Sequence, residues 1–129
     1  MTYRPISAKR AQTGPMQSTV SQHPHAAVVV LSGELDAHTA TQLRALLAEQ
    51  LLAGPGNLVV DLSELSFIDS AGLATLIAAD KGTRRAGMKL VLAAPAPSVR
   101  QVLTITGIDA VLATADTVDE ALSLLAPTY

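Results

Sequence analysis

Short apolar runs alternate with amphipathic stretches along most of this chain. Apolar runs bounded by turn residues predict β-strands at residues 26–31, 58–62, 88–93 and 110–114. A weaker alternation of polar and apolar residues over residues 16–21 predicts one further strand at the edge of the sheet. The turn at His23-Pro24-His25 would join this strand to the next one in antiparallel fashion.

Four helices are predicted between and after these strands, because apolar residues there recur at spacings of three and four. The first is expected to begin at Asp36 as its N-cap and to stop before Gly54, and the second to run from Asp69 to about residue 86. The third opens at Pro95 and Pro97 and ends at Gly107, and the fourth follows a capping box that starts at Thr117. Strands that alternate with helices predict an α/β fold with a largely parallel sheet.

The length of 129 residues suits one domain with its own core. The first fifteen residues are polar and show no period, so we expect residues 1–15 to be a flexible tail and residues 16–126 to form the domain. The absence of cysteine excludes disulfides and thiolate catalysis. The aromatic residues are Tyr3, Phe67 and Tyr129 alone, which argues against an interface built on aromatic hot spots.

A net charge of −2 gives no basic footprint for nucleic acid. Lys81, Arg84, Arg85 and Lys89 form a basic group, but such residues also suit a solvated helix end. Residues 1–16 lack the apolar segment of a signal peptide, and no apolar run approaches the roughly 20 residues that span a bilayer. We therefore expect a soluble protein of the cytoplasm.

The stretch from Leu65 to Leu73 carries the sharpest chemical signal. Asp69 is a good N-cap residue, and Ser70 follows it in the first turn of the second predicted helix. Unpaired backbone N–H groups and the helix dipole favour negative charge at such a place, so a phosphate on Ser70 would meet a ready anion site. The simpler interpretation, in which Asp69 and Ser70 only cap a helix, remains open.

No enzyme signature accompanies this serine. The nucleophile elbow of a hydrolase needs glycine two residues before the serine, where this chain has Ile68. The histidines at 23 and 25 have no third metal ligand at a useful spacing, and residues 54–56 lack the lysine of a phosphate-binding loop. We therefore predict no catalytic residue, no metal site and no cofactor.

Two ordered motifs resemble those of the STAS domain family, and most closely those of bacterial anti-sigma factor antagonists. They comprise Leu31-Ser32-Gly33-Glu34-Leu35-Asp36 with Thr39, and Val59-Val60-Asp61-Leu62-Ser63 with Phe67-Ile68-Asp69-Ser70-Ala71-Gly72-Leu73. The resemblance extends over about residues 17–125. It implies a single STAS domain, an α/β fold whose mostly parallel sheet has four to five strands and is accompanied by four helices.

The resemblance also implies a function. Members of the family bind an anti-sigma factor that is a serine kinase with a histidine-kinase-like ATPase fold, and binding releases a sigma factor. The kinase then phosphorylates the serine after the aspartate of the motif, which is Ser70 here; a second serine that often follows is replaced by Ala71. The partner-binding residues implied are Glu34, Asp36, Thr39, Asp69, Ser70, Ala71 and Gly72.

Two other functions remain open on the sequence. The chain could be a STAS accessory subunit of a membrane transporter of the lipid or ABC type, in which Ser70 is only a helix cap. It could also be an enzyme or a nucleotide-binding module, which the missing catalytic set and phosphate loop disfavour. The expectation that we carry forward is a regulatory binding protein that is not itself a catalyst.

Overall fold

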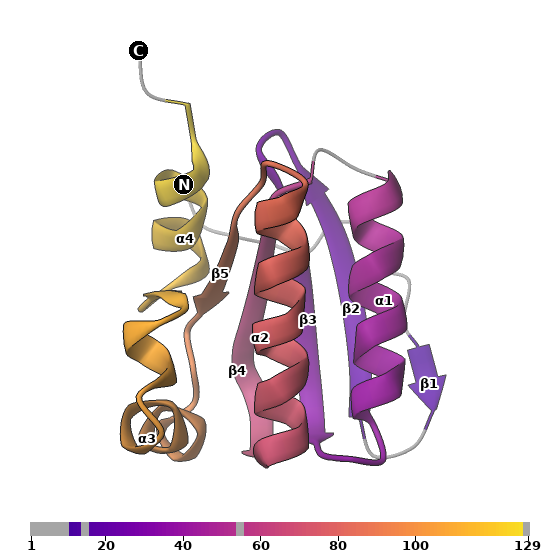
Figure 1. Cartoon of the computed structure of the whole chain (residues 1–129), viewed down its shortest axis with the longest axis vertical. Helices are drawn as coiled ribbons and strands as arrows, with labels where there is room; N and C mark the ends of the chain where they lie inside the picture. The colour runs from indigo at the N-terminus through magenta and orange to yellow at the C-terminus, as the bar shows by residue number, and fades with distance from the viewer. Residues whose placement is uncertain (1–10, 14–15, 54–55, 128–129) are drawn as a thin grey trace.

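The computed structural model describes residues 11–13, 16–53 and 56–127 (Figure 1). Its centre is a six-stranded sheet with the strand order β1-β2-β3-β4-β5-β6. The strands are β1 (Ala11–Thr13), β2 (Met16–His23), β3 (Ala26–Leu35), β4 (Leu58–Ile68), β5 (Leu90–Ala93) and β6 (Ala113–Ala115). Strand β2 pairs antiparallel with both β1 and β3, and the strands from β3 to β6 pair parallel with one another. This mostly parallel sheet confirms the predicted fold class.

The structure adds the short strand β1 to the five predicted strands. It pairs with the beginning of β2, from Thr13 opposite Met16 to Ala11 opposite Ser18. Residues 11–13 fall within the segment 1–15 that was predicted to be a tail, and they pair here with β2. A three-residue strand with no clear alternation is fixed by pairing with its neighbour and not by its own sequence pattern. Residues 1–10 and 14–15 lie outside the described part of the chain.

The four predicted helices are confirmed. They are α1 (Ala40–Ala53), α2 (Ser70–Arg85), α3 (Pro97–Ile105) and α4 (Val118–Leu125), with a short 3-10 turn at Ile108–Ala110. Helices α1 and α2 lie side by side on one face of the sheet (Figure 1). Thr117 accepts a hydrogen bond from the Glu120 amide at 3.0 Å, so the predicted N-cap of α4 is present.

The core divides into two clusters because successive side chains of a strand point to opposite faces. On β3, Val29 and Leu31 join the cluster that contains Leu43 and Leu47 of α1 and Leu76 of α2. The intervening residues of β3 join a second cluster with α4; they are Ala26, Val28 and Val30. Strand β3 is thus buried on both faces over its first six residues, which explains its continuous apolar run.

The first helix begins at Ala40, four residues after the predicted N-cap Asp36. The Asp36 carboxylate caps a turn that precedes the helix, accepting hydrogen bonds from the amides of His38 at 2.9 Å and Thr39 at 3.0 Å. The Thr39 hydroxyl in turn donates to the carbonyl of Glu34 at 2.9 Å. Asp36 therefore opens the β3–α1 loop and caps its turn, and it is not the N-cap of the helix as predicted.

Strand β4 extends to Ile68 instead of ending at the predicted residue 62. Between Asp61 and Phe67 the pairing with β3 shifts register twice, and each shift inserts one extra residue in β4. These β-bulges place the buried side chains at every third position, Leu62, Leu65 and Ile68, so the alternation that marks a strand is lost. The apolar run that predicted this strand ends at residue 62, where the bulges begin, so the sequence did not predict the second half of β4.

The remaining strand boundaries also moved. Met88 was predicted to open a strand, but its amide donates to the Thr83 carbonyl at 2.8 Å and closes the end of α2, while Gly87 has a φ of 77°. Strand β5 therefore begins at Leu90. The last strand lies at 113–115 and not at 110–114, because the segment before it is a 3-10 turn that buries Ile108.

Candidate functional site

The end of β4 and the start of α2 hold Ser70 in an exposed position. Asp69 is the N-cap of α2, and its carboxylate accepts a hydrogen bond from the Gly72 amide at 3.0 Å. Ser70 is the first residue of the helix and is exposed. The capping predicted for Asp69 is confirmed, and it orients the first turn so that the Ser70 hydroxyl lies at the surface.

Gly72 brings α2 against the end of β3. A Cβ atom at this position would lie 2.7 Å from the Leu35 carbonyl oxygen and 2.9 Å from Cγ1 of Ile68. The same carbonyl oxygen accepts a hydrogen bond from the Asp69 amide at 3.2 Å. Only glycine allows this close approach, which fixes the N-terminus of α2 beside the last residue of β3.

The β3–α1 loop reaches the same edge of the sheet as Ser70, because parallel strands end together. Glu34 and Leu35 pair with Phe67 and Ile68, directly before the cap of α2. Glu34 is exposed and Asp36 is half-buried. The two sequence motifs, which are about thirty residues apart, therefore meet at one surface.

Thr39 takes a supporting position in this loop. Only 2% of the residue is exposed, and its hydroxyl donates to the Glu34 carbonyl and accepts from the Asp36 amide at 3.0 Å. Gly72 is likewise buried. Of the predicted partner-binding set, these two residues can influence a partner only through the shape of the backbone that they hold.

The bulged end of β4 exposes residues that the sequence analysis did not include in the site. Ser63, Glu64, Ser66 and Phe67 are all exposed and stand between the buried positions of this strand. The signal that could have identified them is the three-residue apolar period from Leu62 onward, which fits neither a helix nor a regular strand.

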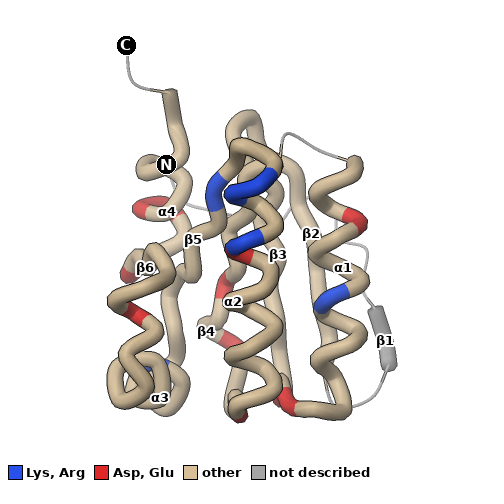
Figure 2. The backbone as a smooth tube through the Cα atoms, in the orientation of Figure 1, with Lys and Arg blue, Asp and Glu red and all other residues tan. Residues whose placement is uncertain are grey.

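The two ends of the molecule differ in charge. Carboxylates of Glu34, Asp36, Glu64 and Asp69 belong to the segments at the Ser70 end. Figure 2 shows that Lys and Arg gather at the opposite end of α2 and at the start of β5. There Arg84 pairs with the buried Asp80 through an Nε–Oδ2 distance of 3.0 Å, as suits the end of a helix.

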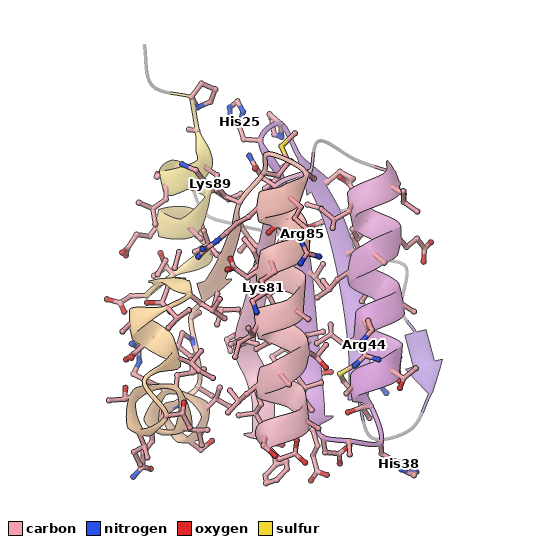
Figure 3. The ribbon with its side chains drawn as sticks, viewed as in Figure 1. His25, His38, Arg44, Lys81, Arg85 and Lys89 are labelled. Atoms are coloured by element: carbon pink, nitrogen blue, oxygen red, sulfur yellow. The ribbon has the colours of Figure 1, made fainter. Side chains whose placement is uncertain are left out.

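The geometry at Ser70 is not that of an internally activated nucleophile. Within the described part of the chain, no side chain accepts a hydrogen bond from the Ser70 hydroxyl. His38 lies at the same end of the molecule as Ser70, whereas His25 lies at the other end (Figure 3). Among the described residues, no group of three His, Asp or Glu side chains could hold a metal ion. What the site presents is an exposed hydroxyl at a helix N-terminus, accessible to another protein.

Comparison with known proteins assigns this chain to a family. The STAS domain family model matches residues 17–121, and the chain belongs to this family. The anti-sigma-F factor antagonist RsfB of Mycobacterium tuberculosis is 30% identical over 105 residues, which cover 81% of this chain and 85% of RsfB. Both segments that meet at Ser70 lie within the matched residues.

Solved structures agree with this assignment. An anti-sigma factor antagonist from Mycobacterium paratuberculosis has a TM-score of 0.74 at 29% identity, covering 85% of this chain and 93% of that one. The anti-sigma factor antagonist SpoIIAA in its unphosphorylated form has a TM-score of 0.70 at 26% identity, covering 83% and 94%. The phosphorylated form of the Bacillus protein SpoIIAA shares the fold, with a TM-score of 0.64 at 23% identity over 84% and 99%. Across the described residues, no helix has both the length and the apolar character to cross a bilayer.

Proposed function

We propose that this chain is an anti-sigma factor antagonist of the bacterial cytoplasm, a regulatory protein and not an enzyme. In its unphosphorylated form it binds an anti-sigma factor that is a serine kinase, and it thereby releases a sigma factor. Phosphorylation of Ser70 by that kinase ends the interaction. The observation that carries this proposal is the exposed Ser70 hydroxyl on the capped first turn of α2.

The local structure suits a reversible phosphate. A phosphoserine adds about −1.5 to −2 charges at neutral pH and three acceptor oxygens. The helix N-terminus stabilises such a charge, and the cap of Asp69 uses only the Gly72 amide, so the fold should survive the modification. The phosphate can therefore act on the complex without unfolding the protein.

The complex with the kinase, in contrast to the fold, should be strongly weakened by a phosphate on Ser70. For phosphoryl transfer, Ser70 must face the terminal phosphate of the nucleotide in the kinase, and a phosphoserine there meets like charge. Burying a charge without compensation costs several kcal/mol. Moving a complex from almost fully bound to almost fully free requires only about 5.5 kcal/mol. One phosphate is thus sufficient for the switch.

The proposed contact surface combines the segments that meet at this edge. Glu34, Asp36, Asp69, Ser70 and Ala71 are exposed or half-buried and can touch a partner directly. In our proposal Thr39 and Gly72 hold the two backbone segments in place. Ala71 leaves Ser70 as the one acceptor within the motif.

Phosphorylation and binding can be tested together. The protein is incubated with ATP and an extract of its source cells, and its intact mass and peptides are then measured. We expect one phosphoryl group on Ser70, no gain of mass in Ser70→Ala, and normal phosphorylation of the control Ser63→Ala, which alters a nearby exposed hydroxyl. Stable copurification with a transporter subunit, without phosphorylation, would instead support the accessory-subunit alternative.

The switch itself is tested with the purified kinase. Ser70→Ala should remain in the binding form in the presence of ATP. Ser70→Asp should lose affinity while its melting curve stays close to that of the wild type, because the N-terminus of α2 accommodates a carboxylate. Binding of Ser70→Asp as tight as that of the wild type would refute the proposed switch.

A further inference from the structure

Phe67 is the only phenylalanine of the chain, and 46% of it is exposed. It stands at the end of β4, two residues before the cap of α2 and three before Ser70. Because the chain has few aromatic residues, the sequence argued against an interface built on aromatic hot spots. The exposed position of Phe67 instead favours a contact made by this one aromatic side chain. Leaving a large aromatic surface in water forgoes the free energy that its burial would provide.

The bulges of β4 produce this exposure. Their extra residues keep Leu65 and Ile68 in the core and leave Ser66 and Phe67 between them on the outside. A regular strand would alternate, and Phe67 and Leu65 would then share one face. The two register shifts therefore allow β4 to keep its core contacts and still direct Phe67 outward. Bulges near functional sites are known to reorient side chains in this way.

The backbone that carries Phe67 is held from both sides. The Ser66 hydroxyl donates to the Gly33 carbonyl of β3 at 2.9 Å, and the Ser98 hydroxyl of α3 donates to the Ser66 carbonyl at 3.4 Å. Glu34 is the residue paired with Phe67 across the two strands. An aromatic side chain on a fixed backbone loses little conformational freedom when it binds, as hot-spot residues require.

Acidic side chains accompany Phe67. Glu34 is its neighbour on β3, Glu64 lies three residues earlier on β4, and both are exposed. Of the described cations, Arg44 lies on α1 and Lys81 on α2 (Figure 3), and Arg100 of α3 is paired with the Asp116 carboxylate at 3.0 Å. The surface thus presents an apolar centre with carboxylates at its border.

We propose that Phe67 is the apolar anchor by which this protein docks on its partner, and that the partner offers an apolar pocket bordered by Lys or Arg. This inference rests on the proposed function and identifies the chemistry of the kinase surface around its nucleotide site. Phe67 supplies affinity, Glu34 and Glu64 supply attraction and orientation, and Ser70 supplies the phosphorylation switch.

The anchor is tested by measuring the affinity of purified variants for the purified anti-sigma factor kinase. Phe67→Ala should weaken binding at least ten-fold. The matched control is Leu52→Ala, since Leu52 is 91% exposed near the C-terminus of α1 and should change affinity less than two-fold. Phosphorylation kinetics should show a raised KM for Phe67→Ala with kcat nearly unchanged, because docking is lost and the chemistry is not.

The acidic border is tested by association rates at low and at physiological salt. Glu64→Gln should slow association and reduce its dependence on salt, whereas Glu49→Gln, on the body of α1, should leave both unchanged.

The outcomes separate this inference from the function on which it rests. Wild-type affinity in Phe67→Ala, together with lost binding in Ser70→Asp, would overturn the anchor and leave the phosphorylation switch standing. A ten-fold loss in Phe67→Ala with unchanged salt dependence in Glu64→Gln would support the anchor and overturn the basic border. If the wild type binds no such kinase, both the inference and the proposed function fail.

Discussion

Two glycines in α2 provide a sharp test of how the site is held. At Gly72 an added Cβ would lie 2.7 Å from the Leu35 carbonyl oxygen and 2.8 Å from Cγ of the same residue. At Gly82, ten residues further along the same helix, the nearest neighbour of an added Cβ would be Cδ1 of Leu51 at 3.9 Å. The substitutions Gly72→Ala and Gly82→Ala therefore add the same methyl group in opposite surroundings.

The expected free energies follow from helix propensity and packing. Alanine is favoured over glycine within a helix by about 1 kcal/mol, so Gly82→Ala should stabilise the protein by about that amount. At Gly72 the crowding should cost about 1–3 kcal/mol, because the backbone oxygen of Leu35 cannot rotate away as a side chain can. After the gain in propensity, Gly72→Ala should destabilise the protein by up to about 2 kcal/mol.

The measurement is urea unfolding of both variants and the wild type, accompanied by thermal melts. The two variants should differ by about 1–3 kcal/mol in the free energy of unfolding, which is the cost of crowding at Gly72. At about 4 °C per kcal/mol, this separates their melting temperatures by roughly 4–12 °C. Equal stabilisation by both substitutions would refute the close packing of α2 on β3, and with it the reason for glycine at position 72.

Three further substitutions test two hydrogen bonds of the site and one strained backbone position. Asp69→Ala should cost about 1 kcal/mol of unfolding free energy through loss of the bond to the Gly72 amide, and Asp69→Asn should keep most of it; urea curves for the pair check this. Thr39→Val should cost about 1–3 kcal/mol, because it removes the hydroxyl with which the buried Thr39 donates to the Glu34 carbonyl; calorimetry measures it, and a loss under about 0.5 kcal/mol would contradict the role of this loop bond. Ala94→Gly should stabilise the protein by about 0.5 kcal/mol, since alanine holds a φ of 51° there and the relief slightly exceeds the added entropy of the unfolded chain; a lower melting temperature would count against this backbone strain.

The parts of the fold and the site that the sequence predicted are those with local causes. Asp69 as the cap of α2, the end of α2 before Gly87 and the cap at Thr117 depend on hydrogen bonds between residues two to five apart, so the sequence contains the whole interaction. The start of α1 was placed at Asp36 for the same reason, but the Thr39 hydroxyl closes a turn before the helix begins.

The parts that the sequence did not predict depend on residues far apart in the chain. Strand β1 exists through pairing with β2, and the second half of β4 is a strand only because β3 accommodates two extra residues beside it. The exposure of Phe67 follows from those register shifts, and the one local sign of it in the sequence is the three-residue apolar period from Leu62 onward.

The sequence by itself therefore determined the alternation of strands and helices, the capped serine and, through its motifs, the family. Apolar periodicity and capping depend on residues that are close together in the chain, so they can be recognised from the sequence alone. Tertiary structure alone decided that Glu34, Phe67 and Ser70 share one surface, and that Thr39 and Gly72 support it from within. Parallel pairing of β3 with β4 and the close approach of α2 to Leu35 impose this arrangement, because both join segments about thirty residues apart.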